Sequence, residues 1–215
     1  CAGCATTDKT SLLKFKSDGK NYEVVIVDSA DGTVTLPKDP EKNGYKFDGW
    51  FLDENKWENP LKTDSKIKED TEVFAKWSIV SYAITYDLDG GAYTGDETNP
   101  AQYTIESADI TLKHVEREGY AFAGWYLGEN RVQTIQKGST GNIELTAKWV
   151  KDGYSITYLN TKGAENDNPL AYVISDKAIA LKALEKVGYS FDGWFEGDKN
   201  VTEIAANRTG DMTLT

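Results

Sequence analysis

The sequence predicts a predominantly β protein of the α+β class, built from small domains in tandem. The first observation behind this prediction is an aromatic octapeptide that occurs three times, as GYKFDGWF (44–51), GYAFAGWY (119–126) and GYSFDGWF (188–195). The second is an alternation of apolar and polar residues in the segments that open and close each copy, which is typical of half-buried strands. The third is the glycine-rich turns between these segments.

The three copies divide the chain into repeats. Ala-Lys-Trp closes the first two copies, and residues 119–146 align with 188–215 at a constant offset of 69. This register places a third Ala-Lys-Trp directly after Thr215, so we expect the closing strand of the last repeat to be truncated. We therefore expect a tail at 1–10, repeat 1 at 11–77, repeat 2 at 81–149 and repeat 3 at 153–215. The short connectors between them are unsuited to flexible tethering.

Each repeat is expected to open and close with a strand. The inward-facing positions of the opening strands are Leu13 and Phe15, Ile84 and Tyr86, and Ile156 and Tyr158. The matching positions of the closing strands are Val73, Ala75 and Trp77 in repeat 1, and Leu145, Ala147 and Trp149 in repeat 2. The spacing of two residues places each set on one face of its strand.

One segment favours a helix by propensity alone, AIALKALEKV at 178–187. Its counterpart in repeat 1 carries Pro37 and Pro40, which a helix interior would not accommodate. Since equivalent segments should share a conformation, we predict that 178–187 is extended. If each repeat contains a helix, we expect a short one after the motif tryptophan, around 55–61.

The aromatic motif is interpreted as core rather than as an exposed binding platform. Its aromatic and glycine positions persist while the residues between them vary, and a large aromatic side chain buries about 150–250 Å². A unit of about 70 residues needs such anchors, because it has little other apolar surface to bury. The glycine before each tryptophan could host a β-bulge or leave room for the indole. The expected core positions are Tyr45, Phe47, Gly49, Trp50 and Trp77; Tyr120, Phe122, Gly124, Trp125 and Trp149; and Tyr189, Phe191, Gly193 and Trp194.

The stretches ITYDLDGGAYTGDETNP, EGYAFAGWYLGEN and NIELTAKW resemble the Listeria–Bacteroides repeat, which is related to the B-repeat of internalin-type surface proteins. The resemblance covers all three repeats, although repeat 1 lacks the DLDGG turn and carries the insertion DENKWENPLKTD. It implies tandem β-grasp-like (ubiquitin-like) domains joined by short linkers, on a bacterial surface protein or a secreted protein. Members of the family are generally not enzymes.

Charge and cysteine content bear on location and partners. The formal net charge is −11 and the isoelectric point is about 4.7, which disfavours binding to nucleic acid. No apolar run reaches the length of a transmembrane helix. Cys1 and Cys4 stand in CAGC, which resembles the end of a bacterial lipoprotein signal peptide, so both are candidates for lipidation. A redox or metal-binding pair is the less favoured interpretation.

Residues for catalysis are sparse. The single histidine, His114, occurs in one repeat only, and the cysteines lie in the tail. The acids of DLDGGAYTGDET (87–98) invite comparison with a calcium loop, but their offsets differ from those of an EF-hand, and a solvated hairpin turn is the favoured interpretation. We expect no enzyme activity, no cofactor and no metal.

The sequence thus predicts an extracellular, monomeric structural protein, a spacer or stalk that could also bind an unidentified protein or glycan at the cell surface. The alternative is a carbohydrate-binding module that uses exposed aromatic side chains. The candidate exposed contacts are Trp57, Tyr126 and Phe195. Trp57 lies in the insertion of repeat 1, where it could equally form a local cap over the core.

Overall fold

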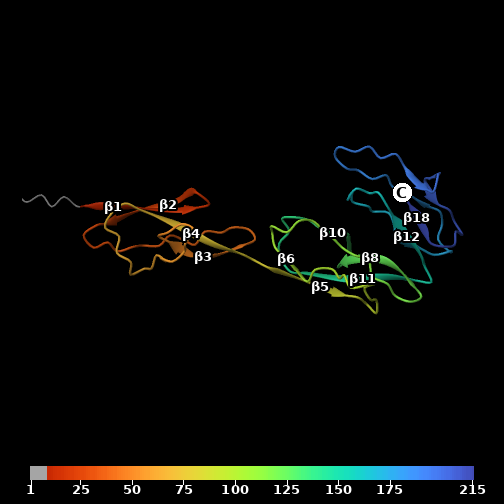
Figure 1. Cartoon of the computed structure of the whole chain (residues 1–215), viewed down its shortest axis with the longest axis horizontal. Helices are drawn as coiled ribbons and strands as arrows, with labels where there is room; N and C mark the ends of the chain where they lie inside the picture. The colour runs from red at the N-terminus through yellow and green to blue at the C-terminus, as the bar shows by residue number, and fades with distance from the viewer. Residues whose placement is uncertain (1–8) are drawn as a thin grey trace, which may run out of the picture. The chain divides into compact units, whose positions relative to one another are not determined.

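The computed structural model describes residues 9–215, and every regular element in this range is a β-strand (Figure 1). The strands gather into several small sheets. The predicted predominance of β-structure is confirmed, but the helical part of the α+β prediction is wrong for the described residues. None of the elements in residues 9–215 is a helix that could cross a membrane.

The helix expected at 55–61 is replaced by an irregular turn. Asn55 and Trp57 have φ angles of 72° and 57°, which lie in the left-handed region and cannot belong to a right-handed helix. The carboxylate of Asp53 accepts a hydrogen bond from the backbone N–H of Glu58 at 2.9 Å, and this bond lowers the pKa of Asp53. Such local bonding gives the backbone an alternative to the helix.

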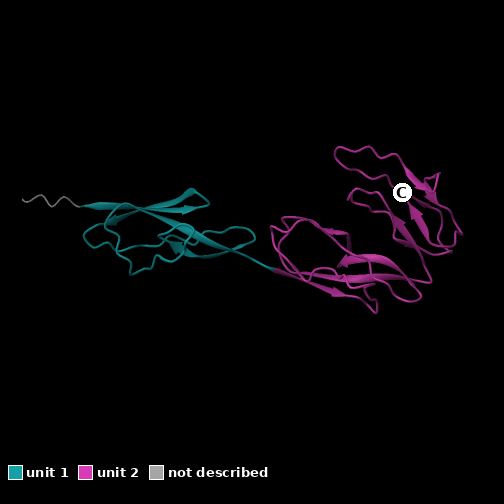
Figure 2. Cartoon of the chain, in the orientation of Figure 1, with its two compact units in different colours: residues 1–81 teal, residues 82–215 magenta. Residues whose placement is uncertain are grey.

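The chain forms two compact units, residues 1–81 and 82–215 (Figure 2). The first unit contains repeat 1, whose strands are β1 (Thr10–Ser17), β2 (Lys20–Asp28), β3 (Tyr45–Phe51) and β4 (Thr71–Ile79). They form one sheet in the order β2-β1-β4-β3. β1 is antiparallel to β2 and parallel to β4, while β3 is antiparallel to β4. The first and last strands of the repeat are therefore central neighbours.

Repeat 2 uses the same plan with an added hairpin strand. Its main sheet has the order β6-β5-β11-β8-β9, with β5 parallel to β11 and β8 antiparallel to β11. β7 and β10 form a separate antiparallel pair. The strands are β5 (Tyr82–Asp87), β6 (Gln102–Tyr103), β7 (Ile110–Thr111), β8 (Tyr120–Leu127), β9 (Asn130–Val132), β10 (Thr134–Ile135) and β11 (Ile143–Lys151).

Repeat 3 keeps the parallel pairing of its opening and closing strands but divides the rest into smaller sheets. β13, β12 and β18 form one sheet, β14 pairs with β17, and β15 pairs with β16. The strands are β12 (Tyr154–Tyr158), β13 (Ala171–Tyr172), β14 (Ile179–Ala180), β15 (Trp194–Glu196), β16 (Lys199–Val201), β17 (Glu203–Ile204) and β18 (Met212–Leu214). The segment 178–187 is not helical, as predicted, because β14 within it pairs with β17.

Each repeat has its own apolar cluster. The motif tryptophans Trp50, Trp125 and Trp194 lie at the centres of these clusters and are at most 3% exposed. Phe47 and Trp77 pack on the first cluster, and Phe122 and Trp149 belong to or pack on the second. Because each repeat has a core of its own, three short domains can follow one another along one chain.

The motif tyrosines lie outside the apolar clusters, contrary to the predicted core placement. Tyr45 and Tyr120 are half-buried at the first positions of β3 and β8. The Lys42 ammonium lies 4.3 Å from the ring centre of Tyr45, and the Arg117 guanidinium lies 4.0 Å from that of Tyr120. At the end of a sheet the ring meets a basic side chain instead of a second apolar layer, so these tyrosines form cation–π contacts.

Repeat 3 departs further from the prediction. Tyr189 is 62% exposed and Phe191 is 37% exposed, and neither lies in a strand. In repeat 2 the strand β11 continues to Lys151 and pairs with the equivalent residues of β8, whereas β18 ends at Leu214. Without that pairing, the aromatic segment before Trp194 has no strand partner in the described residues.

Candidate interaction surfaces

A β-bulge explains the Phe-x-Gly-Trp spacing of the motif. Phe47 pairs with Trp77, and Gly49 pairs with the residue before Trp77, so Asp48 is the extra residue of β3. In a regular strand, Phe47 and Trp50 would point to opposite faces. The bulge returns both rings to the core, where their centres are 5.3 Å apart in an edge-on arrangement. The bulge suggested by the sequence is therefore present.

The glycine of the bulge is required by its backbone and by a close neighbour. Gly124 in repeat 2 has a φ of 124°, and a Cβ there would lie 2.8 Å from Cδ of Arg131. The bulge again follows Phe122, whose ring centre is 5.7 Å from that of Trp125 and 5.4 Å from that of Trp149. The motif thus builds a compact aromatic cluster rather than an open stacking platform.

A buried asparagine fixes the indole of the core tryptophan in two repeats. In repeat 3 the Trp194 indole donates to the carbonyl of Lys182 at 2.9 Å. Asn168, only 1% exposed, donates to the same carbonyl at 2.9 Å and accepts from the Lys182 N–H at 2.6 Å. The same contacts in repeat 2 join Trp125, Lys113 and Asn99.

These asparagines were not among the residues predicted from the sequence. The sequence feature that could have identified them is the dipeptide Asn-Pro, which occurs at 99–100 and again at 168–169. Repeat 1 has no such contact, and the indole N–H groups of Trp50 and Trp77 are buried without a hydrogen-bond partner among residues 9–215. The tryptophan anchor is therefore more fully bonded in repeats 2 and 3 than in repeat 1.

The three candidate exposed aromatics are each partly covered. Trp57 is half-buried and packs edge-on against Phe51, with ring centres 5.6 Å apart. Tyr126 is half-buried beneath the Lys148 ammonium, which lies 4.3 Å from its ring centre. Phe195 is half-buried in β15. Each of these rings presents only part of its surface to solvent.

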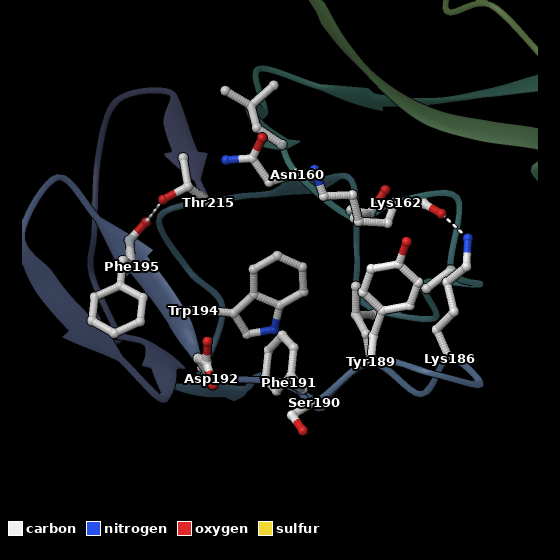
Figure 3. Close-up of a pocket in the computed structure, with 15 residues that line it drawn as sticks. Asn160, Lys162, Lys186, Tyr189, Ser190, Phe191, Asp192, Trp194, Phe195 and Thr215 are labelled. Atoms are coloured by element: carbon white, nitrogen blue, oxygen red, sulfur yellow. Dashed lines mark hydrogen bonds between the residues drawn. The ribbon is translucent and has the colours of Figure 1, made fainter.

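A groove in repeat 3 exposes more aromatic surface (Figure 3). It encloses a cavity of about 370 Å³ beside Trp194, and Tyr189 and Phe191 form one wall. Asn160 and Lys162, from the loop after β12, line the other side, as Figure 3 shows. Tyr189 and Phe191, 62% and 37% exposed, are more exposed than the three half-buried candidate aromatics.

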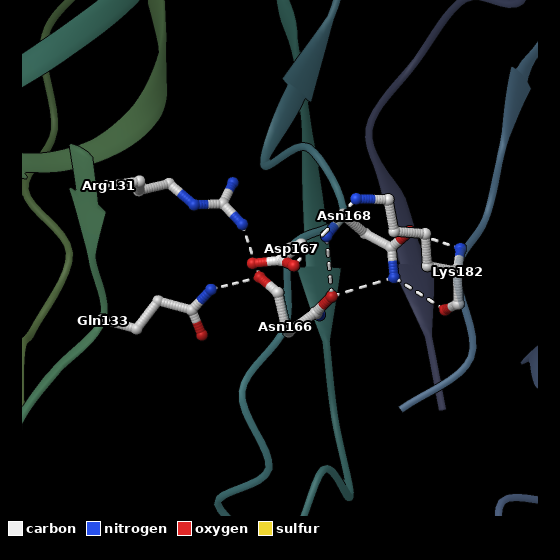
Figure 4. A network of polar contacts seen from close by, with 6 residues as sticks. All are labelled: Arg131, Gln133, Asn166, Asp167, Asn168 and Lys182. Carbon is white, nitrogen blue, oxygen red and sulfur yellow. Dashed lines mark hydrogen bonds and ion pairs between the residues drawn. The ribbon is translucent and has the colours of Figure 1, made fainter. Parts of the chain in front are cut away.

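A polar network connects repeat 2 to repeat 3 (Figure 4). The side chains of Arg131 and Gln133 both donate to the main-chain carbonyl of Asn166. The side-chain oxygen of Asn166 in turn accepts from the backbone N–H of Asn168 at 3.0 Å and from its amide at 2.8 Å. Because Asn168 also bonds Lys182, the network leads from the hairpin of repeat 2 to the core of repeat 3. We call this network of Arg131, Gln133, Asn166, Asn168 and Lys182 the Asn166 joint.

A crevice of about 190 Å³ lies beside the Asn166 joint, between repeats 2 and 3. His114 lines it and lies against Phe122, with ring centres 5.1 Å apart. Packing against the crevice wall lowers the pKa of His114 by desolvation, although the residue as a whole is exposed. Burial raises the pKa of Tyr158 on the other wall, and the charge of Arg131 opposes this rise.

The acids of the 87–98 turn are engaged locally. Asp87 accepts the backbone N–H of Asp89 at 3.0 Å, Asp89 pairs with Arg117 at 3.4 Å, and Glu97 pairs with Lys113. Within residues 9–215 no group of three or more His, Cys, Asp or Glu side chains could hold a metal ion. Cys1 and Cys4 lie outside the described residues.

Comparison with known proteins identifies related sequences. The family model of the Listeria-Bacteroides repeat domain matches residues 12–76, 82–148 and 154–215. The chain is 33% identical over 213 residues, 94% of its length, to a protein described as a Gly-rich membrane protein of Evansella cellulosilytica. It is 32% identical over 145 residues, 64% of its length, to Internalin H of Listeria monocytogenes. The chain spans about a quarter of each relative, 24% and 25% respectively. No solved structure matches the chain.

Proposed function

Since this chain belongs to the Listeria-Bacteroides repeat family, with three tandem copies, we propose that it is a non-catalytic spacer at the bacterial cell surface. In this role the repeats hold a neighbouring segment or partner away from the envelope. The names of the relatives, a membrane protein and an internalin, support the surface location. Lipidation at Cys1 or Cys4 would supply an anchor.

The observation that carries the spacer proposal is the Asn166 joint. A spacer keeps its two ends far apart only if the junctions between consecutive domains resist bending. Repeats 2 and 3 are linked by the two residues Asp152 and Gly153, and the Asn166 joint adds two side-chain hydrogen bonds across the junction. Asn166 is only 4% exposed, so these bonds are shielded from competing water.

We further propose a helix-free β-grasp-like fold for each repeat. In support, the opening strand forms an antiparallel pair with the second strand and lies parallel to the closing strand, as β1 does with β2 and β4. The motif strand completes the sheet on the other side. An irregular segment takes the place that a helix would occupy.

Carbohydrate binding through Trp57, Tyr126 or Phe195 has less support as a second function. Stacking on a sugar ring requires an open aromatic face, and these three side chains are half-buried. The edge-on contact between Trp57 and Phe51 favours the local cap. A glycan array with the chain and its Trp57→Ala variant provides the test, and specific binding lost in the variant would revive this function.

The spacer proposal is tested by presentation of an epitope. We would fuse the epitope after Thr215, attach the chain to a bacterial surface through its N-terminal end, and measure binding to antibody-coated beads. We expect binding to fall when residues 82–215 are deleted. We expect a partial fall in the variant Arg131→Met/Gln133→Leu, which removes the donors of the Asn166 joint but keeps side-chain volume. Equal binding by all three proteins would contradict a spacer.

A further inference from the structure

The outer strand of the repeat 1 sheet, β2, is long and has a neighbour on one side only. It covers nine residues, and among residues 9–215 it pairs with β1 alone. The strands in the same position of repeats 2 and 3, β6 and β13, have two residues each. Figure 1 shows β2 at the margin of its sheet. A long edge strand presents a row of backbone donors and acceptors to any further strand that fits it.

The backbone of β2 alternates between groups that bond to β1 and groups that point outward. The N–H of Ser29 donates to the carbonyl of Lys9 at 2.8 Å, and the antiparallel register continues this bonding at every second residue of β2. The N–H and C=O groups of Val24 and Ile26 therefore point away from β1. Within residues 9–215 they form no ladder or turn bond.

The exposed face beside this edge is apolar. Val24 is 48% exposed and Ile26 is 70% exposed, and their spacing of two residues places them on the same face of β2. Leu12 of β1, the register partner of Ile26, is 36% exposed. Between Lys20 and Asp28 the strand has no lysine and no proline, which commonly protect an exposed edge. The edge thus offers apolar side chains as well as hydrogen bonds to an added strand.

The charges at the two ends of β2 favour an antiparallel partner with the same sequence. Lys20 begins the strand and Asp28 ends it; both are exposed, and neither forms an ion pair within residues 9–215. If two β2 strands pair antiparallel about Val24, Lys20 of each chain lies opposite Asp28 of the other. A parallel pair in register would place like charges side by side.

We propose that two copies of this chain associate through repeat 1, with their β2 strands paired antiparallel about Val24. The two four-stranded sheets would then form one continuous sheet across a two-fold axis. The outward backbone groups would supply the hydrogen bonds, and Val24, Ile26 and Leu12 of both chains would form one apolar strip. The proposal departs from the monomeric state predicted from the sequence and does not depend on the spacer function.

The first test is sedimentation equilibrium of the whole chain with Cys1 and Cys4 changed to serine. About 150 mM salt would screen the repulsion between chains of net charge −11. We expect a reversible dimer with a Kd between about 10 and 500 μM, because one added strand pair is a small interface. A chain that remains monomeric at about 1 mM would overturn the proposal.

Ile26→Lys should raise the Kd at least about tenfold, because it places a charge in the apolar strip. The matched control is Ile174→Lys, at a turn position of repeat 3 that is 52% exposed, and it should leave the Kd unchanged. Val24→Pro removes an outward N–H that the fold does not use, so it should weaken the dimer without unfolding repeat 1. Equal Kd values for all these proteins would contradict the proposal.

A charge exchange tests the direction of the pairing. Lys20→Glu and Asp28→Lys should each raise the Kd, because each places like charges at both ends of the interface. The double variant Lys20→Glu/Asp28→Lys restores opposite charges and should dimerise more tightly than either single variant. A double variant weaker than both single variants would rule out the antiparallel arrangement.

Amide hydrogen exchange locates the interface. The amides of Val24 and Ile26 should exchange more slowly as the concentration of the chain rises, because they enter a ladder only in the dimer. The amides of Val25 and Val27, which bond to β1, should be protected at every concentration. A dimer in which Val24 and Ile26 exchange at the monomer rate would use another surface, and the proposal would be wrong.

Discussion

Buried polar side chains fix the positions of the core aromatics at the level of single residues. Asn168 satisfies both main-chain groups of Lys182, while the Trp194 indole shares the Lys182 carbonyl. Three polar groups are therefore satisfied around an asparagine side chain that is only 1% exposed. A buried hydrogen-bonded group is costly to remove, because its partners lose their bonds without gaining water.

We predict that Asn168→Ala destabilises unit 82–215 by about 2–4 kcal/mol, since it leaves the Lys182 N–H and carbonyl underbonded. Urea denaturation followed by tryptophan fluorescence measures the change. Asn43→Ala, at an exposed position of repeat 1, is the matched control and should change the free energy of unfolding by less than about 0.5 kcal/mol. Similar effects of the two substitutions would contradict the role of Asn168.

We predict that His114 makes the stability of unit 82–215 depend on pH. Burial lowers its pKa in the folded state, so the unfolded chain binds the proton more readily. Stability should therefore be greatest above the ordinary histidine pKa of about 6.5 and should fall as the pH drops through that value. The loss should level off once the pH is below the folded-state pKa.

The measurement for this prediction is urea denaturation between about pH 7.5 and 5.5, above the range where most carboxylates titrate. In the His114→Gln variant, the free energy of unfolding should change less with pH, because the contribution of His114 is removed. Parallel pH profiles for the two proteins would show that His114 does not titrate differently in the two states.

The sequence predicted the anchoring tryptophans but not their polar partners. Tryptophan and phenylalanine repeat at fixed spacing and have few alternatives to burial, so Trp50 and Phe122 could be placed in a core. Asn99 and Asn168 could not, because asparagine is common in turns and its burial depends on packing between distant segments. The motif tyrosines were misplaced because alternation identifies a strand face but not where the core ends.

At the level of the elements, one inserted residue decides the orientation of the aromatic motif. The bulge at Asp48 places Phe47 and Trp50 on the same face of β3. A glycine before the tryptophan indicated this feature in the sequence. The short helix expected after the motif did not form, because left-handed turn residues and side-chain bonds from Asp53 define that segment.

Gly124→Ala tests the bulge. Its positive φ strains any other residue, and the new Cβ would also press on Arg131. Gly49 has nearly the same φ, 126°, but a Cβ added there would lie 3.7 Å from its nearest neighbour, a ring carbon of Phe51. Gly49→Ala therefore measures the backbone strain alone. We expect backbone strain to lower the free energy of unfolding by about 1–3 kcal/mol in each of the two variants, and we expect a larger total decrease for Gly124→Ala. Equal losses measured by thermal denaturation would show that the contact with Arg131 has no cost.

At the scale of the whole molecule, the central claim is that repeats 2 and 3 form one rigid segment of the spacer. The repeat boundaries and the tandem order were accessible from the sequence, because the motif recurs. The Asn166 joint was not, because Arg131, Gln133 and Asn166 belong to no repeated motif. Their contact arises only when two folded repeats meet.

A spin-label distance measurement tests this claim most directly. Labels would replace Lys137 in repeat 2 and Glu203 in repeat 3, both exposed, with Cys1 and Cys4 changed to serine. We predict one narrow distance distribution that broadens in Arg131→Met/Gln133→Leu and stays narrow in the control Lys148→Met. A broad distribution with the Asn166 joint intact, or no broadening after its donors are removed, would contradict the rigid segment.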